Sequence, residues 1–236
     1  MVKNKLLNIF RESSKKYLGN IWIVLPSVFL WIFLVAFSKL SVKVNYQIQS
    51  TFILSVWLVF YSLVYVLVVS FFLSGLVALC ASLFRNQKRN FLSSAYKFWM
   101  KNFVIIIFYI LVYNCVRIVS HYSVFYIGKA LNIPTNYASV LFFIVYFAGM
   151  LGILIFLTFS SFCLVIYNKS IFASIKKSIE IVKKNYIETL SVLVLLFAIN
   201  KLLYHNLDFI WIEIIDAFLI VPYLAIILTK FVVDSK

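Results

Sequence analysis

Acidic residues are scarce in this sequence, and cysteine and histidine are scarcer still. Its 236 residues include 7 Asp and Glu, 3 Cys and 2 His, and only 12% of the chain is charged. A soluble chain typically has about 25% charged residues, so the sequence excludes an ordinary soluble domain. Three cysteines without a C-x-x-C spacing predict neither a disulfide framework nor a metal site, and each lies in an apolar run that would bury it.

The short motifs of catalysis are also missing. The sequence contains no H-E-x-x-H, G-x-G-x-x-G, P-loop or G-x-S-x-G pattern, and no nucleophile with a base and an orienting residue can be named. His121 and His205 have no nearby cysteine or paired carboxylate that would complete a metal site. We therefore expect no enzymatic activity, no cofactor, and no catalytic, cofactor-binding or metal-binding residues.

Apolar residues are what the chain has in excess. They make up 64% of the sequence and include 25 Phe, 15 Tyr and 5 Trp, which is too much apolar surface for intrinsic disorder. A helix that crosses a membrane needs a run of about 18 or more apolar residues. Six runs qualify, at residues 21–40, 51–84, 103–120, 137–167, 186–203 and 209–229. We predict an all-α bundle of six transmembrane helices that forms one integral membrane domain over residues 1–236.

Positive charge alternates from loop to loop along the chain. Of the 22 Lys and Arg, 17 lie before the first run, between the second and third, between the fourth and fifth, or after the sixth. Such an excess of cations marks the cytoplasmic loops of membrane proteins. We expect the protein in the cell membrane with both termini in the cytoplasm. The net charge of +15 then faces anionic lipid of the inner leaflet and not nucleic acid.

Three basic segments, each just before a run, have the pattern of amphipathic helices. In the third segment, Ile171, Ile175, Ile179 and Val182 share one face and the lysines lie on the other. We expect these helices to lie in the inner membrane interface. The residues expected to contact lipid head groups are Arg89, Lys97, Lys101, Lys176, Lys177, Lys183 and Lys184.

The second and third segments also align with each other. An offset of 83 residues pairs Cys80 with Cys163, Lys101 with Lys184 and Asn102 with Asn185. Together with the charge pattern, this alignment predicts a repeated unit of one interfacial helix followed by two spans.

A resemblance follows from this layout. The segments FASIKKSIEIVKKNYIETL and FLSSAYKFWMKNFVIIIFYIL, each a basic amphipathic helix leading into a span, resemble six-span bacterial and archaeal membrane families of unknown function. Those families are similar to the membrane domain of some glycerophosphodiester phosphodiesterases. The resemblance implies a six-helix fold and carries over no catalytic residue.

Polar residues near the outer leaflet form the main candidate site. Asn114, Arg117, Lys201, Glu213 and Asp216 all fall there in the predicted topology. One hypothesis is that Arg117 and Lys201 pair with Glu213 and Asp216 in a cluster that joins three spans. The alternative is that the cations snorkel to the interface and the acids precede the sixth span.

The function that these features favour is noncatalytic. We expect a membrane protein that engages anionic lipid or a membrane partner through its basic helices. The alternative is a small-solute transporter or channel that uses the outer polar cluster, although the spans carry few deep polar groups. Small residues every fourth position, Ser70, Ser74, Ala78 and Ser82, favour close helix packing within the bundle, or else with a second copy or another membrane protein.

Overall fold

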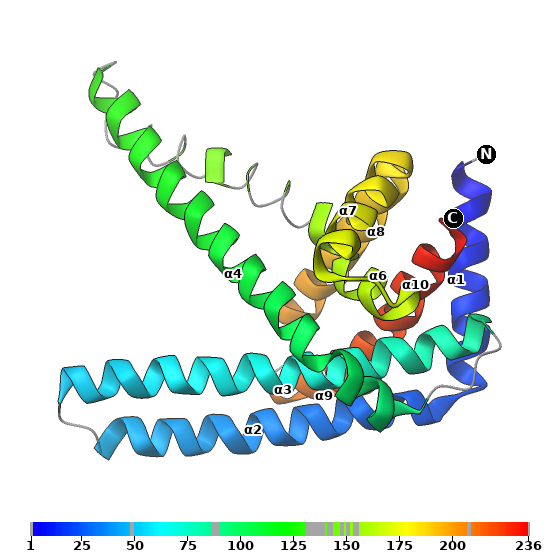
Figure 1. The fold of residues 1–236 in the computed structure, drawn as a ribbon, viewed down its shortest axis with the longest axis horizontal. Helices are drawn as coiled ribbons and strands as arrows, with labels where there is room; N and C mark the ends of the chain where they lie inside the picture. The colour runs from blue at the N-terminus through cyan, green and yellow to red at the C-terminus, as the bar shows by residue number, and fades with distance from the viewer. Residues whose placement is uncertain are drawn as a thin grey trace.

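The computed structural model describes residues 2–47, 50–85, 90–130, 140, 144–146, 149, 152, 156–206 and 209–235. Every element in this part of the chain is helical (Figure 1). The α-helices are α1 (Val2–Leu18), α2 (Val24–Gln47), α3 (Thr51–Arg85), α4 (Phe91–Ala130), α6 (Ser160–Tyr167), α7 (Ile171–Lys184), α8 (Tyr186–Asn206), α9 (Phe209–Ile215) and α10 (Val221–Asp234). A 3-10 turn, η1 (Ile21–Ile23), precedes α2, and a π-helical segment, η2 (Asp216–Ile220), joins α9 to α10. The all-α prediction is confirmed for these residues.

Four helices of the described chain are long and apolar enough to cross a membrane. They cover Ile21–Asn45, Thr51–Arg85, Phe91–Ser123 and Ile212–Asp234. These segments correspond to the predicted runs at 21–40, 51–84, 103–120 and 209–229. The protein is therefore a helical protein of membrane type.

The other two predicted spans are only partly described. Part of the run at 137–167, all of it before residue 156, lies outside the described residues, and the end of the run forms α6. The run at 186–203 lies within α8, whose Tyr186–Leu195 stretch is apolar. Six spans, the repeated unit and the direction of the termini therefore stay predictions.

α2 and α3 form a long antiparallel hairpin (Figure 1). Phe37 of α2 stacks on Tyr61 of α3, with ring centroids 4.7 Å apart. Toward its N-terminus α3 exposes large apolar side chains such as Phe52 and Val59. Exposed apolar side chains along a helix of this length are what lipid would cover.

α4 differs from the prediction of a separate interfacial helix that ends before a span at residue 103. The helix runs from Phe91 to Ala130 without a break, because no glycine or proline occurs between residues 91 and 127 to interrupt it. Its buried positions near the start are Ser94, Ala95, Phe98 and Asn102, whereas the apolar Leu92 and Tyr96 are exposed. The first turns of α4 therefore pack on protein and continue into the span.

Small side chains let α3 approach α4 closely. Ser70 and Ser74 of α3 are fully buried, and the Asn102 amide of α4 donates to the Ser74 hydroxyl at 3.1 Å. A methyl group on Gly75 would lie 2.3 Å from the Phe91 ring, so a larger residue at position 75 would displace this ring. The predicted packing role of the small residues on α3 is confirmed within the bundle.

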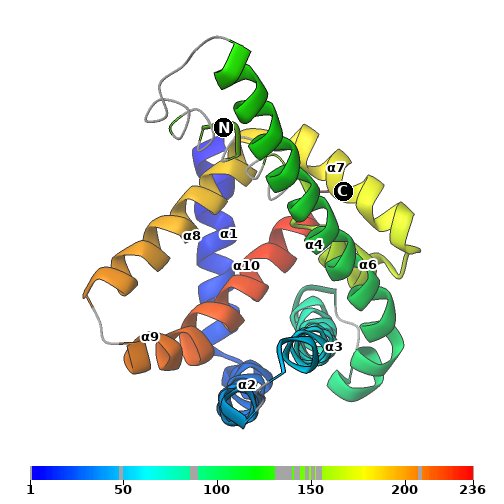
Figure 2. The ribbon, with the colours of Figure 1, turned by 90° about the vertical axis from the view of Figure 1, so that its left-hand side faces the viewer.

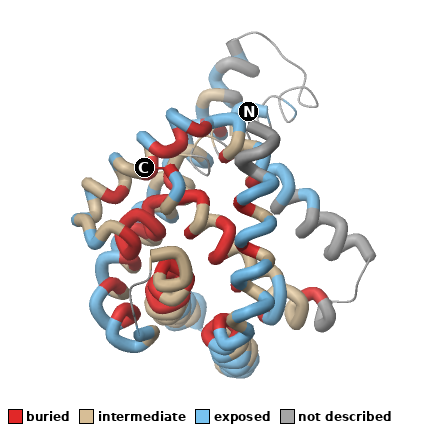
Figure 3. Tube along the Cα trace, turned by 90° about the vertical axis from the view of Figure 1, so that its right-hand side faces the viewer, coloured by how far each residue is buried: buried red, intermediate tan, exposed pale blue. Residues whose placement is uncertain are grey.

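The core lies where α3, α6, α7 and α10 meet. Val77 of α3, Leu164 of α6, Val182 of α7 and Val232 of α10 belong to one buried cluster. Figure 3 shows the buried residues gathered in the packed middle of the molecule, with exposed residues along the outer faces. Cys80 and Cys163 are buried as predicted, but Cys115 is exposed on α4, because this part of α4 packs little against the described chain.

Two prolines of the described chain lie near the starts of α2 and α10. Pro26 lies in the first turn of α2, where a missing N–H costs nothing. Pro222 lies in the first turn of α10, directly after η2. Because Pro222 has no N–H, the Phe218 carbonyl has no α-helical donor, and the Val221 N–H bonds back to the Asp216 carbonyl.

Candidate functional site at the basic end

Most of the predicted head-group cations lie at one end of the bundle. We call this the basic end: α1, the last turn of α3, the first turns of α4, α6, α7 and the last turn of α10. Lys97, Lys101, Lys176, Lys183 and Lys184 are exposed and Lys177 is half-buried, whereas Arg89 lies outside the described residues.

α7 presents three different faces around its circumference. The face buried against neighbouring helices holds Ser174, Ser178, Ile181 and Val182. Beside it lies an apolar flank of Ile175, Ile179 and Phe172, and Phe172 is 85% exposed. The remaining arc holds Lys176, Lys177, Lys183 and Lys184. The amphipathic helix is confirmed, but its protein-facing centre is displaced from Ile175 toward the serines.

The serines explain this displacement. Ser178 donates a hydrogen bond to the Phe156 carbonyl at 2.7 Å, and Ser174 donates to the Ser170 carbonyl at 2.7 Å. Both hydroxyls are satisfied, so these small side chains can be buried at a close helix contact. When the protein-facing side of α7 is predicted from hydrophobic residues alone, both serines are treated as polar, and the predicted side is wrong.

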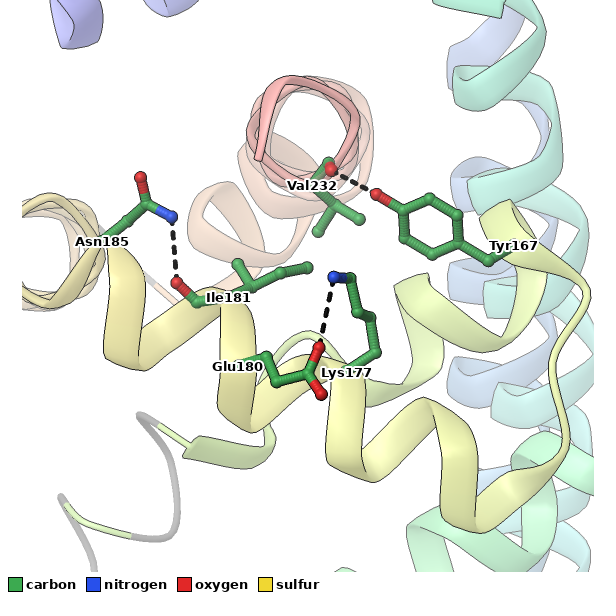
Figure 4. A network of polar contacts seen from close by, with 6 residues as sticks. All are labelled: Tyr167, Lys177, Glu180, Ile181, Asn185 and Val232. Carbon is green, nitrogen blue, oxygen red and sulfur yellow. Dashed lines mark hydrogen bonds and ion pairs between the residues drawn. The ribbon is translucent and has the colours of Figure 1, made fainter. Parts of the chain in front are cut away.

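A polar network holds the helix ends together at the basic end (Figure 4). Tyr167 donates to the Val232 carbonyl at 2.8 Å, and Arg85 donates to the Ile166 carbonyl at 2.7 Å. The accepting carbonyls lie in the last turns of α10 and α6, where no intrahelical donor follows. The Arg85 guanidinium also lies 4.9 Å from the centre of the Tyr167 ring. Arg85 therefore packs against Tyr167 and caps the end of α6, so its guanidinium is not available to lipid head groups.

α1 is bound to η2 and α10 by a ladder of polar contacts. Glu12 pairs with Lys230 at 2.7 Å, Ser14 shares a hydrogen bond with Tyr223 at 2.9 Å, and Tyr17 donates to the Phe218 carbonyl at 2.6 Å. This carbonyl is the one that Pro222 leaves without a helical donor. Burial raises the pKa of the Tyr17 phenol, which keeps it protonated as a donor.

Lys230 is a largely enclosed cation of this region. Its ammonium lies 2.7 Å from Glu12, 3.1 Å from Asp234 and 5.4 Å from the centre of the Phe84 ring, and its side chain is 15% exposed. The two carboxylates neutralise it. Lys177 is likewise paired, with Glu180 at 3.2 Å (Figure 4).

The residues of the predicted outer-leaflet cluster are dispersed among helices in the described structure. Asn114 donates to the Ile110 carbonyl of its own helix, and Arg117 is exposed on the same helix, α4. Glu213 of α9 accepts a hydrogen bond from the Trp31 indole of α2 at 3.4 Å, and Asp216 begins η2. The ion pairs among described side chains include none of Arg117, Glu213 and Asp216. The side chain of Lys201 lies outside the description, so its pairing stays a prediction.

Sequence reasoning missed Glu12, Lys230 and Asp234. The i,i+4 spacing of Lys230 and Asp234 was a signal for their pair. Glu12, the only acid before residue 180, was a signal that α1 has a cationic partner. Among the described residues, no group of His, Cys, Asp and Glu could hold a metal ion.

Comparisons with protein-family models, with curated proteins and with solved structures find no match to this chain. The function must therefore be argued from the basic end itself.

Proposed function

We propose that this chain is a noncatalytic multi-pass membrane protein that engages anionic lipid at its basic end. The observation that carries the proposal is the three-faced helix α7. Its apolar flank, with Phe172 almost fully exposed, lies beside Lys176 and Lys183. A helix with this arrangement can rest on protein with one face, place the flank in lipid and direct its cations to head groups.

The orientation of α1 supports the same proposal. α1 lies across the direction of α2 and α3 in both views (Figures 1 and 2). If α2 and α3 cross the membrane, α1 lies along its surface. Arg11, Lys15 and Lys16 are exposed on α1, and Lys97 and Lys101 are exposed at the start of α4. Each cation near an anionic surface contributes about 1 kcal/mol.

Native mass spectrometry of the detergent-solubilised protein tests the proposal. We expect tighter binding of phosphatidylglycerol than of phosphatidylcholine. Lys176→Gln with Lys183→Gln should weaken phosphatidylglycerol binding by about 2 kcal/mol, or ~30-fold. Equal affinity of the unaltered protein for both lipids would overturn the proposal.

A matched control removes two cations elsewhere. Lys39 and Lys43 are exposed near the other end of α2. Lys39→Gln with Lys43→Gln lowers the net charge by the same amount as Lys176→Gln with Lys183→Gln. If the position of the lysines and not the total charge decides binding, this control should leave phosphatidylglycerol affinity unchanged.

A further inference from the structure

A groove lies between α1 of the basic end, α8, η2 and the first half of α10. Its volume is about 400 Å³, within the range of clefts that hold small ligands. The walls are Phe10, Ser14, Tyr17 and Leu18 of α1, Leu195 of α8, and Leu219, Ile220, Tyr223, Leu224 and Ile227 of η2 and α10.

The few hydroxyls in this groove are already engaged. Ser14 donates to the Phe10 carbonyl and is paired with Tyr223, and Tyr17 donates to the Phe218 carbonyl. A polar ligand would have to break these bonds to gain its own. The lining therefore selects an apolar occupant.

The rim of the groove on α1 is cationic. On a helical projection Ser14 faces the groove, and Arg11 and Lys15 follow at about 60° and 100° to one side, next to Leu18. Arg11 and Lys15 are exposed, and neither belongs to an ion pair among the described side chains. Glu12 lies about 60° beyond Lys15 on the same projection, and its carboxylate pairs with Lys230. An anionic group at the rim thus meets two cations, and the one carboxylate of α1 is engaged by Lys230.

From this geometry we propose that the groove binds one acyl chain of an anionic phospholipid whose phosphate is held by Arg11 and Lys15. The proposal rests on the proposed function, since it takes the basic end to face an anionic leaflet. It adds a defined site, separate from α7, at which one lipid molecule is retained and helps hold α1 against α10.

Two pairs of variants test the site by native mass spectrometry of the full chain in detergent. Leu195→Trp places an indole in the groove and should abolish the tightest phosphatidylglycerol binding, whereas Val194→Trp, on the exposed neighbouring position of α8, should not. Arg11→Gln with Lys15→Gln should weaken phosphatidylglycerol binding about tenfold or more. It should weaken phosphatidylcholine binding less, because the choline cation offsets the charge of the phosphate. Lys39→Gln with Lys43→Gln is again the charge-matched control.

The outcomes separate this site from the α7 surface. Tight binding that survives Leu195→Trp but is lost with Lys176→Gln and Lys183→Gln overturns the groove and leaves the α7 proposal standing. The reverse result supports the groove and overturns the α7 proposal. Insensitivity to the Arg11 and Lys15 changes overturns phosphate recognition at the rim.

A measurement on the unaltered protein covers the case in which Leu195→Trp does not fold. Phosphatidylglycerol with a photoreactive group near the end of one acyl chain should crosslink to the groove walls around Leu18, Leu195 and Leu219. Crosslinks spread evenly over the exposed apolar faces of α2, α3 and α4 would overturn the site.

Discussion

At the scale of single residues, the cations of the basic end have different roles. Lys230 is enclosed by Glu12, Asp234 and the Phe84 ring, and Arg85 caps the end of α6. Lys176 and Lys183 are exposed beside an apolar flank. Because an enclosed cation needs its counter-ions, the exposed cations, and not Lys230 or Arg85, are available to head groups.

The enclosure of Lys230 makes a stability prediction. Glu12→Gln with Asp234→Asn removes both counter-ions, and we expect a loss of about 1–3 kcal/mol because the ammonium stays largely desolvated. Glu180→Gln, which removes the partner of the more exposed Lys177, should cost less than about 1 kcal/mol. Thermal unfolding in detergent measures both, and equal losses would contradict a special role for Lys230.

Asn102 gives a second prediction at this scale. Its amide donates to Ser74, but its buried side-chain oxygen has no hydrogen-bond partner among the described residues. Asn102→Asp would place a carboxylate in this position, and we expect a loss of at least about 3 kcal/mol. Asn114→Asp, on the exposed part of the same helix, should change the melting temperature little. Similar melting temperatures for the two variants would show that Asn102 is hydrated.

At the scale of elements, α1 and the last transmembrane helix depend on each other. Pro222 leaves the Phe218 carbonyl without a helical donor, and the Tyr17 hydroxyl from α1 supplies one. In a membrane protein a freed carbonyl must find a donor on a neighbouring helix, a side chain or water. An irregularity in one helix therefore fixes the position of another.

A double-mutant cycle tests this dependence. Tyr17→Phe should destabilise the protein by about 1–2 kcal/mol, because the Phe218 carbonyl loses its donor. In a Pro222→Ala background the backbone N–H of residue 222 can take that carbonyl, so Tyr17→Phe should cost at least about 0.5 kcal/mol less. Additive effects of the two changes would contradict the coupling.

At the scale of the whole molecule, the two ends of the long helices differ in charge and packing. The basic end holds the core, the helix caps and the ion pairs of the described chain. The opposite halves of α2, α3 and α4 expose apolar side chains. A membrane with a cytoplasmic leaflet at the basic end fits both properties.

Cysteine labelling tests this orientation. Cys115→Ser is needed first, because Cys115 is exposed whereas Cys80 and Cys163 are buried. In that background, His121→Cys should react with a membrane-impermeant maleimide from outside the cell. Lys176→Cys should react only after the membrane is opened. Labelling of both positions from the same side would contradict the predicted topology.

The sequence by itself determined the class of protein and the position of its charge. Composition and run length predict long apolar helices, and four of them are present in the described chain. The class of protein follows from residue type and run length, because a helix that crosses lipid needs a minimum apolar length. The positions of the charged side chains around each helix follow from their spacing, because the helical period decides which residues share a face.

Only the tertiary structure decided which residues face protein. Repeat-aligned Asn102 and Asn185 are both buried, yet α4 continues through Asn102 whereas α7 ends before Asn185. Ser178 faces protein because the Phe156 carbonyl, which lies outside α7, provides an acceptor. Lys230 is neutralised by Glu12, 218 positions away, and such a pair exists only when α1 and α10 are packed together. Contacts between distant segments depend on how helices pack, and the spacing of residues along one helix does not contain that information.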